Sequence, residues 1–163
     1  MKKITFLALL SVLALSAIAQ NKFGYIDSQE LLMLMPERKK AETDVQNFAK
    51  SLETQLGSMT AEYQQGVQEY QANETTYTDL DKQDKIAEIT GLEQRIQTFQ
   101  QGAQQSLEAK QQELLIPINN KLKDAIKAVS EEGGYTYIFA DEVLHYKDEK
   151  NDVSVLVKKK LGL

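Results

Sequence analysis

Residues 133–146 read GGYTYIFADEVLHY, and this stretch sets the interpretation of the chain around it. Gly133 and Gly134 follow a long helical pattern, and glycine at this position typically ends a helix. Tyr135–Ala140 is rich in aromatic and β-branched residues, which predicts a strand. Val143–Tyr146 predicts a further short strand after a polar turn. The chain is therefore expected to leave a long helix and enter a small strand-forming region.

Upstream of this stretch, a helix is predicted from about residue 85 to Glu132. Its apolar residues recur at the spacing of a coiled-coil seam, the stripe of side chains that packs against a partner helix. These residues are Ile89, Leu92, Ile96, Phe99, Ala103, Leu107, Leu114, Ile118, Leu122, Ile126 and Val129. The phase of the repeat shifts between Ala103 and Leu114, which locally unwinds a supercoil. Pro117 predicts a bend, because proline removes one intrahelical hydrogen bond.

A second helical pattern begins at about Glu37. Nine of twelve seam positions between residues 42 and 80 are apolar or aromatic, and the exceptions are Glu42, Gly66 and Asn73. The segment Thr78–Asp84 is dense in Asp and Thr, which cap new helices, so it is expected to reverse the chain. Together the two patterns predict a long antiparallel coiled-coil hairpin over residues 37–132.

The two ends of the chain both predict strands and short helices. Phe23–Asp27 reads as a strand, Gln29–Met35 as a short helix that Pro36 ends, and residues 151–161 as a final helix capped by Asp152. The hairpin would bring residues 20–36 and 133–163 together as one β-containing body. Three short strands and a thin helical seam bury little apolar surface, so the chain is expected to form a homo-oligomer.

Residues 1–19 have the features of a secretory signal peptide. Lys2 and Lys3 precede an apolar run of thirteen residues, and small residues at 17 and 19 predict cleavage after Ala19. A spanning helix needs roughly 20 apolar residues, and no second long apolar run follows, so no stable membrane anchor is expected. The mature chain is therefore expected to be exported.

Composition excludes several classes of function. The chain has no Cys and one His, which leaves no disulfide framework and no thiol nucleophile. No phosphate-binding glycine loop, metal-ligand spacing or nucleophile–base pair is found, so neither an enzyme nor a cofactor or metal site is expected. The mature chain carries 17 basic and 24 acidic residues, a net charge of −7, which argues against nucleic acid as a partner.

In this order of elements the sequence resembles the Skp/OmpH family of periplasmic chaperones. The resemblance rests on Phe23–Leu32, Tyr135–Tyr146 and Asn151–Leu161, and it covers essentially the whole mature chain. It implies a mainly α fold with a small β-body and a jellyfish-like homotrimer whose helical arms surround a cavity. It also implies an ATP-independent holdase that keeps unfolded outer-membrane proteins from aggregating. A structural or adaptor coiled coil of the cell envelope is the alternative.

The resemblance and the patterns together assign residues to three roles. The oligomerisation body is expected to use Phe23, Tyr25, Ile26, Tyr135, Tyr137, Ile138, Phe139, Val143, Leu144 and Tyr146. Weak points at Gly66, Gly102 and Pro117 are expected either to loosen the arms or to be tolerated without a role. Tyr63, Tyr70 and Tyr77 are expected either to pack against the return helix or, with Met59, to contact clients.

The charge departs from the family's basic members. Residues 60–100 hold three basic and eight acidic side chains, a net charge of −5 near the tip of the hairpin. A basic lipopolysaccharide site is therefore doubtful in this chain, as is electrostatic capture of acidic clients.

Overall fold

The computed structural model describes residues 21–163, so the predicted signal peptide and its cleavage site lie outside the described residues. The described elements are β1 (Lys22–Ile26), α2 (Ser28–Leu34), α3 (Pro36–Asn73), α4 (Asp79–Gly133), β2 (Tyr135–Ala140), the single turns η1 (Asp141–Val143) and η2 (Glu149–Asn151), and α5 (Ser154–Leu161). Their contacts divide them into a body, residues 21–34 and 121–163, and a hairpin, residues 35–120. The predicted mainly α class with a small β part is confirmed. In residues 21–163 no helix has the length and apolar character that crossing a membrane requires.

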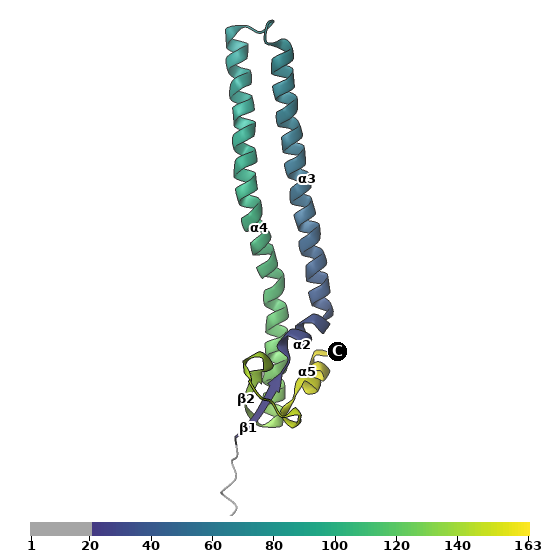
Figure 1. Cartoon of the computed structure of the whole chain (residues 1–163). Helices are drawn as coiled ribbons and strands as arrows, with labels where there is room; N and C mark the ends of the chain where they lie inside the picture. The colour runs from purple at the N-terminus through teal and green to yellow at the C-terminus, as the bar shows by residue number, and fades with distance from the viewer. Residues whose placement is uncertain (1–20) are drawn as a thin grey trace, which may run out of the picture. The chain divides into compact units, whose positions relative to one another are not determined.

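The hairpin consists of α3 and the first part of α4, which lie side by side and run in opposite directions (Figure 1). The described contacts put α4 residues 121–133 with the body, whereas the sequence placed them in the arm. Along the hairpin the apolar seam is half-buried, and Leu92 is its most buried residue at 3% exposure. Two helices packed only against each other bury their shared seam to this extent, because each helix leaves its outer face in water.

The chain reverses earlier than the sequence indicated. Helix α3 ends at Asn73, whose side-chain amide donates to the backbone oxygen of Glu69 at 2.9 Å, and α4 begins at Asp79. Thr78 and Asp81 cap α4 reciprocally, so Thr78 starts the new helix and does not open the turn. The expected reversal over Thr78–Asp84 was therefore placed too late. Leu80, the last seam position predicted for the helix that begins at about Glu37, instead lies on α4 and is 67% exposed.

The sheet of the body has two parallel strands, not the three that the sequence predicted. In β1 and β2, Phe23 lies opposite Tyr137 and Tyr25 lies opposite Phe139. Residues 141–146 form no strand: a single helical turn begins at Asp141, and the Lys147 ammonium pairs with the Asp141 carboxylate at 2.6 Å. The free edge of β1 instead receives Asp152 through a bridge to Tyr25, and the Val153 N–H donates to the Tyr25 carbonyl oxygen at 3.0 Å.

The core of the body is built by β1, α2, α5 and the end of α4. Its buried apolar side chains are Tyr25, Ile26, Leu31, Leu122, Ala125, Val129, Val153, Val157 and Leu161. Asp152, predicted to cap α5, lies one residue before the N-cap Val153, and its carboxylate accepts the Ser154 N–H at 2.8 Å. Leu156, predicted to share the buried face of α5, is 47% exposed. The Ser154 hydroxyl accepts the Asp27 N–H at 3.2 Å and so ties α5 to the end of β1.

Candidate functional site

One face of the sheet in the body presents a cluster of exposed aromatic rings, which we call the aromatic face: Phe23, Tyr137 and Phe139. The ring centroids lie 6.0 Å apart for Phe23 and Tyr137, 6.3 Å for Phe23 and Phe139, and 6.0 Å for Tyr137 and Phe139. The three side chains are 47%, 58% and 39% exposed in the same order. The parallel register causes this, because side chains two residues apart on each strand point to the same side. A contiguous apolar patch of this kind typically marks an interaction surface.

The opposite side of the sheet faces the interior of the body. Ile26 is 3% exposed, and Ile138 is half-buried and lines a shallow groove together with Ile126 and Lys127 of α4. Gly24 lies on the same side of the sheet as Ile26 and Ile138, and a Cβ at Gly24 would approach the Val153 side chain to 3.2 Å. The neighbouring residues Ile138 and Phe139 thus lie on opposite sides of the sheet.

Tyr25 points to the side of the aromatic face but is covered by its own chain. It is 5% exposed, and the Lys147 ammonium lies 5.2 Å from its ring centroid. Burial, and next the nearby Asp152 carboxylate, raise the pKa of the Tyr25 hydroxyl. Lys147, which directly follows the segment predicted as a third strand, therefore covers the Tyr25 end of the aromatic face.

The ten residues assigned to oligomerisation occupy three different environments. Phe23, Tyr137 and Phe139 form the aromatic face, while Tyr25 and Ile26 are core residues of a single chain. Tyr135, Ile138 and Leu144 are half-buried; Val143 and Tyr146 are 68% and 85% exposed and lie outside the sheet. The structure thus brings three of the ten together on one exposed surface.

The residues expected to contact clients lie along the hairpin. Met59, Tyr63 and Tyr70 are half-buried on α3. Tyr77 lies in the turn, and its ring centroid is 6.3 Å from that of Tyr70. Each of these side chains keeps part of its surface accessible while the rest packs within the hairpin.

The three expected weak points differ in their surroundings. A Cβ at Gly66 would lie 3.5 Å from Ile89 and 3.8 Å from Leu92, so Gly66 faces α4 across the seam. A Cβ at Gly102 would meet nothing within 4 Å. Pro117 lies inside α4, which is continuous from Asp79 to Gly133.

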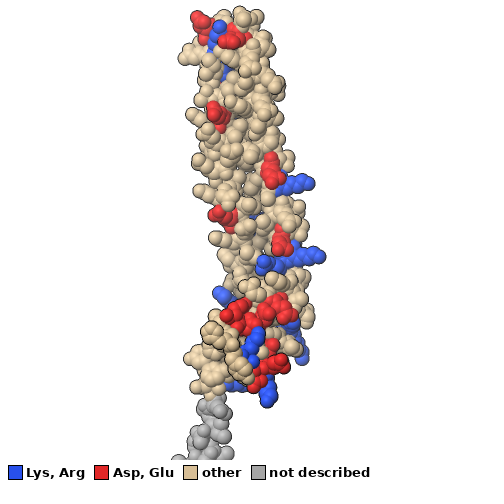
Figure 2. All heavy atoms as spheres, viewed as in Figure 1, with Lys and Arg blue, Asp and Glu red and all other residues tan. Residues whose placement is uncertain are grey.

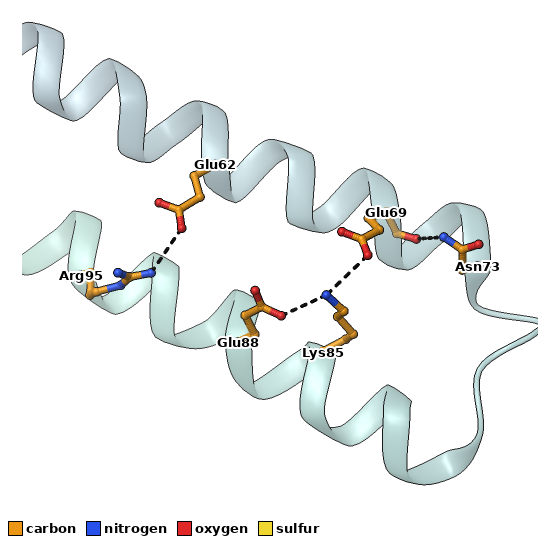
Figure 3. A network of polar contacts seen from close by, with 6 residues as sticks. All are labelled: Glu62, Glu69, Asn73, Lys85, Glu88 and Arg95. Atoms are coloured by element: carbon orange, nitrogen blue, oxygen red, sulfur yellow. Dashed lines mark hydrogen bonds and ion pairs between the residues drawn. The ribbon is translucent and has the colours of Figure 1, made fainter.

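A network of charged side chains joins the two helices near the tip of the hairpin (Figure 3). Arg95 of α4 lies 3.7 Å from Glu62 of α3, and Lys85 lies 3.4 Å from Glu69 and 3.1 Å from Glu88. The Glu88 carboxylate, and next Glu69, raise the pKa of Lys85. Exposed pairs of this kind add little to stability, so they fix the register of the two helices more than they stabilise them. Spacing alone did not reveal these cross-helix pairs.

Three carboxylates in the body lie close together, and two of them are already engaged. The oxygens of Asp27, Asp141 and Glu142 approach one another within 4.8 Å. Asp27 accepts the Glu30 N–H at 2.7 Å as a local turn, and Asp141 pairs with Lys147. Exposed carboxylates with such partners give no metal centre by themselves.

Comparison with known proteins gives one consistent picture. A profile of the family described as "Outer membrane protein (OmpH-like)" matches residues 22–161. The Chaperone protein Skp of Yersinia enterocolitica is 22% identical over 152 residues, which cover 93% of each chain. The Chaperone protein Skp of Pectobacterium atrosepticum is 24% identical over 152 residues, which cover 92% of each chain.

The fold is also found among solved structures. A putative outer membrane chaperone (OmpH-like) from Caulobacter crescentus superposes with a TM-score of 0.75 at 15% identity, covering 89% of this chain and 86% of that one. The family match spans nearly all of the described residues, so the chain belongs to the Skp/OmpH family of periplasmic chaperones, which are not enzymes.

Proposed function

We propose that the chain is a homotrimeric, ATP-independent holdase that binds unfolded outer-membrane proteins between its helical arms after export and cleavage following Ala19. The observation that carries the trimer is the aromatic face, because Phe23, Tyr137 and Phe139 are left exposed by a sheet of only two strands. Joining the sheets of three protomers would bury these rings and pair the outer edge of β2. The body, residues 20–36 and 133–163 in the sequence-based division, would then hold the three arms.

The hairpin supports the proposed client binding. Its side chains at Met59, Tyr63, Tyr70 and Tyr77 are partly accessible, and Met and Tyr adapt to many client shapes. Gly66 and Gly102 lower the helix propensity of the arms, and Pro117 removes one hydrogen bond from α4, so the arms can change shape more readily than the body.

Lipopolysaccharide is not among the proposed partners. Of the three basic side chains in residues 60–100, Lys85 and Arg95 are paired with glutamates across the hairpin. The tip therefore offers Lys82 as its one basic group without an ion pair among the described residues, which is too little to hold a phosphorylated glycolipid.

The holdase proposal is tested by aggregation. An unfolded β-barrel membrane protein is diluted from urea into buffer containing increasing amounts of the mature chain, and light scattering is followed. Scattering should fall to its floor at a ratio of three chains per client. Unchanged scattering over the whole range would refute the proposal, with serum albumin as the control for nonspecific protection.

A structural or adaptor coiled coil is the second candidate, and the regular seam of the hairpin favours it equally. It requires no aromatic face and no trimer. The mass of the mature chain by light scattering separates the two, since a stable dimer supports the adaptor and a trimer the holdase.

A further inference from the structure

The hairpin contains an apolar groove between α3 and α4 that its own side chains leave unfilled. It is lined by Ala49, Leu52, Glu53, Leu56, Phe99, Gln100, Ala103, Gln104 and Leu107, with a volume of about 220 Å³. An engineered apolar cavity of about 150 Å³ is large enough to hold benzene, so the groove has room for one aromatic or branched side chain.

The sequence explains why the groove lies at this level. Ala49 and Ala103 both occupy seam positions and line the same space, where neighbouring seam positions carry Leu52, Leu56 and Leu107. Two small side chains at one level leave a hollow walled by larger ones. The adjacent Gly102 adds no side chain of its own, and the phase of the heptad pattern shifts just after Ala103.

The charge of the hairpin changes at the same level. Residues 35–52 and 107–120 carry five acidic and five basic side chains, whereas residues 53–106 carry nine acidic and three basic ones, a net charge of −6. Two of those three, Lys85 and Arg95, are paired with glutamates, and Glu53 is the charged residue that lines the groove. On the face that Figure 2 shows, the charged side chains of the hairpin are separated from one another by stretches of uncharged surface.

We propose that this groove binds single apolar side chains of unfolded polypeptides, and that it selects segments in which Lys or Arg flanks the apolar residue. The inference rests on the proposed holdase function and names the chemistry of its client segments. The apolar walls would take the side chain out of water, and the acidic half of the hairpin would attract the flanking cations. A second copy of the same hairpin carries the same negative charge and is a poor occupant for that reason.

The test uses the absence of Trp from the chain, which leaves the fluorescence of a Trp-containing peptide as a background-free signal. Two peptides carry the same central Trp between two Leu residues, flanked by Lys in one and by Glu in the other. The full mature chain should bind the Lys peptide at least about tenfold more tightly than the Glu peptide at low salt, and high salt should reduce the difference. Equal affinities would overturn the proposed selectivity.

Filling the groove locates the binding. Ala103→Leu places a large side chain in it, and Ala109→Leu makes the same change at an exposed position of α4. Ala103→Leu should weaken binding of the Lys peptide by about tenfold, the value of one buried side chain, while Ala109→Leu leaves it unchanged. Equal affinity in both variants would place the binding elsewhere and overturn the assignment.

A second variant covers the case in which Ala103→Leu strains the helix pair. Glu53→Gln keeps the shape of the groove and should weaken binding of the Lys peptide about two- to fivefold, while binding of the Glu peptide tightens because a repelling carboxylate is removed. If Glu53→Gln leaves the ratio of the affinities for the Lys and Glu peptides unchanged, the proposed attraction of flanking cations by the groove is contradicted. If Ala103→Leu alters the mass of the assembly while its helix content by circular dichroism stays that of wild type, the groove seats a second copy and the proposal is wrong.

The aggregation assay separates this inference from the function on which it rests. A mature chain that binds the Lys peptide but fails to suppress aggregation would refute the holdase and leave the groove assignment standing. If wild type and Ala103→Leu suppress aggregation equally well, and wild type shows no preference between the two peptides, the groove assignment is refuted and the holdase function stands.

Discussion

Single residues decide where the hairpin turns. Its tip is closed by a capping box in which the Thr78 hydroxyl donates to the Asp81 carboxylate at 2.6 Å and accepts the Asp81 N–H at 3.2 Å. The density of Asp and Thr predicted a reversal in this region, but density does not say which Thr is the cap. The spacing Thr-x-x-Asp occurs both at residues 76–79 and at residues 78–81, and the structure selects the second pair as the cap.

The capping box predicts a pH-dependent stability of the tip. The Thr78 hydroxyl, and next its N–H, hold the pKa of Asp81 below the ordinary value of 3.8, so the charged carboxylate stabilises the folded tip. That stability is complete above pH 3.8 and is lost as the pH falls through the lower pKa of the folded state. Asp81→Asn should lower the thermal midpoint at pH 7, and the difference from wild type should shrink toward pH 2.

The matched variant for this experiment is Glu93→Gln, which removes an exposed carboxylate of α4 outside the capping box. Its thermal midpoint should follow that of wild type at every pH, as seen by circular dichroism. A gap between wild type and Asp81→Asn that is constant from pH 7 to pH 2 would show that the carboxylate charge has no part in the cap.

Two adjacent residues of β2 distinguish assembly from folding. Phe139 is 39% exposed on the aromatic face, whereas Ile138 is half-buried toward α4. Phe139→Asp should yield a folded monomer, because a charge would enter the proposed shared surface and leave the protomer intact. Ile138→Asp should instead unfold the body. Mass by light scattering and the near-ultraviolet dichroism of the tyrosines report the two effects separately.

Retention of the trimer in Phe139→Asp would show that the aromatic face is not the contact between protomers. Val155→Asp is the control for an added surface charge, because Val155 is 73% exposed on α5 and lies outside the sheet. This variant should keep the wild-type mass.

At the level of elements, the sequence predicted the helices and strands that have a regular residue pattern, and it missed features that depend on contacts between distant parts of the chain. The helices of the hairpin follow from their seven-residue repeat, and β1, β2 and α5 follow from alternation and capping. Val143–Tyr146 has strand-like composition but forms none, because Asp152 and Val153 occupy the edge of β1 where it would pair. Alternation also placed Tyr25 beside the aromatic rings without showing that Lys147 and its neighbours cover it.

Replacing glycines inside the helices of the hairpin by alanine should raise the free energy of unfolding. Gly66→Ala should stabilise the hairpin by about 1 kcal/mol, because the new methyl gains helix propensity and fits against Ile89 and Leu92 without a clash. Gly102→Ala, which meets open space, should gain from propensity alone. Denaturant unfolding followed by circular dichroism measures both changes.

The comparison variant is Gly134→Ala. Gly134 has a φ of +66°, in the left-handed region that a Cβ disfavours, so this change should destabilise the protein by about 1 kcal/mol. Destabilisation by Gly66→Ala would mean that the seam at Gly66 is closer than its contacts indicate.

On the scale of the whole molecule, charge is used differently in the two units. In the body, Lys158 pairs with Glu30 of α2 and Lys160 pairs with Glu132 of α4, so two of the three lysines near the end of α5 bind the chain's own elements. These ion pairs favour a structural role for the two lysines over contact with a membrane surface. In the hairpin, the excess of carboxylates is left in solvent, available to an outside partner.

The two units should also differ in how readily they open. The body holds fully buried side chains such as Leu31 and Val157, at 0% exposure each, while the seam of the hairpin is mostly half-buried. Because local opening is easiest where few apolar groups are buried, amides of residues 53–106 should exchange with deuterium at least tenfold faster than those of residues 135–140. Gly66→Ala should slow exchange in the hairpin and leave the body unchanged. Uniform protection along both units would contradict a flexible arm on a rigid body, and would remove the mechanism by which the proposed cavity adjusts to clients of different size.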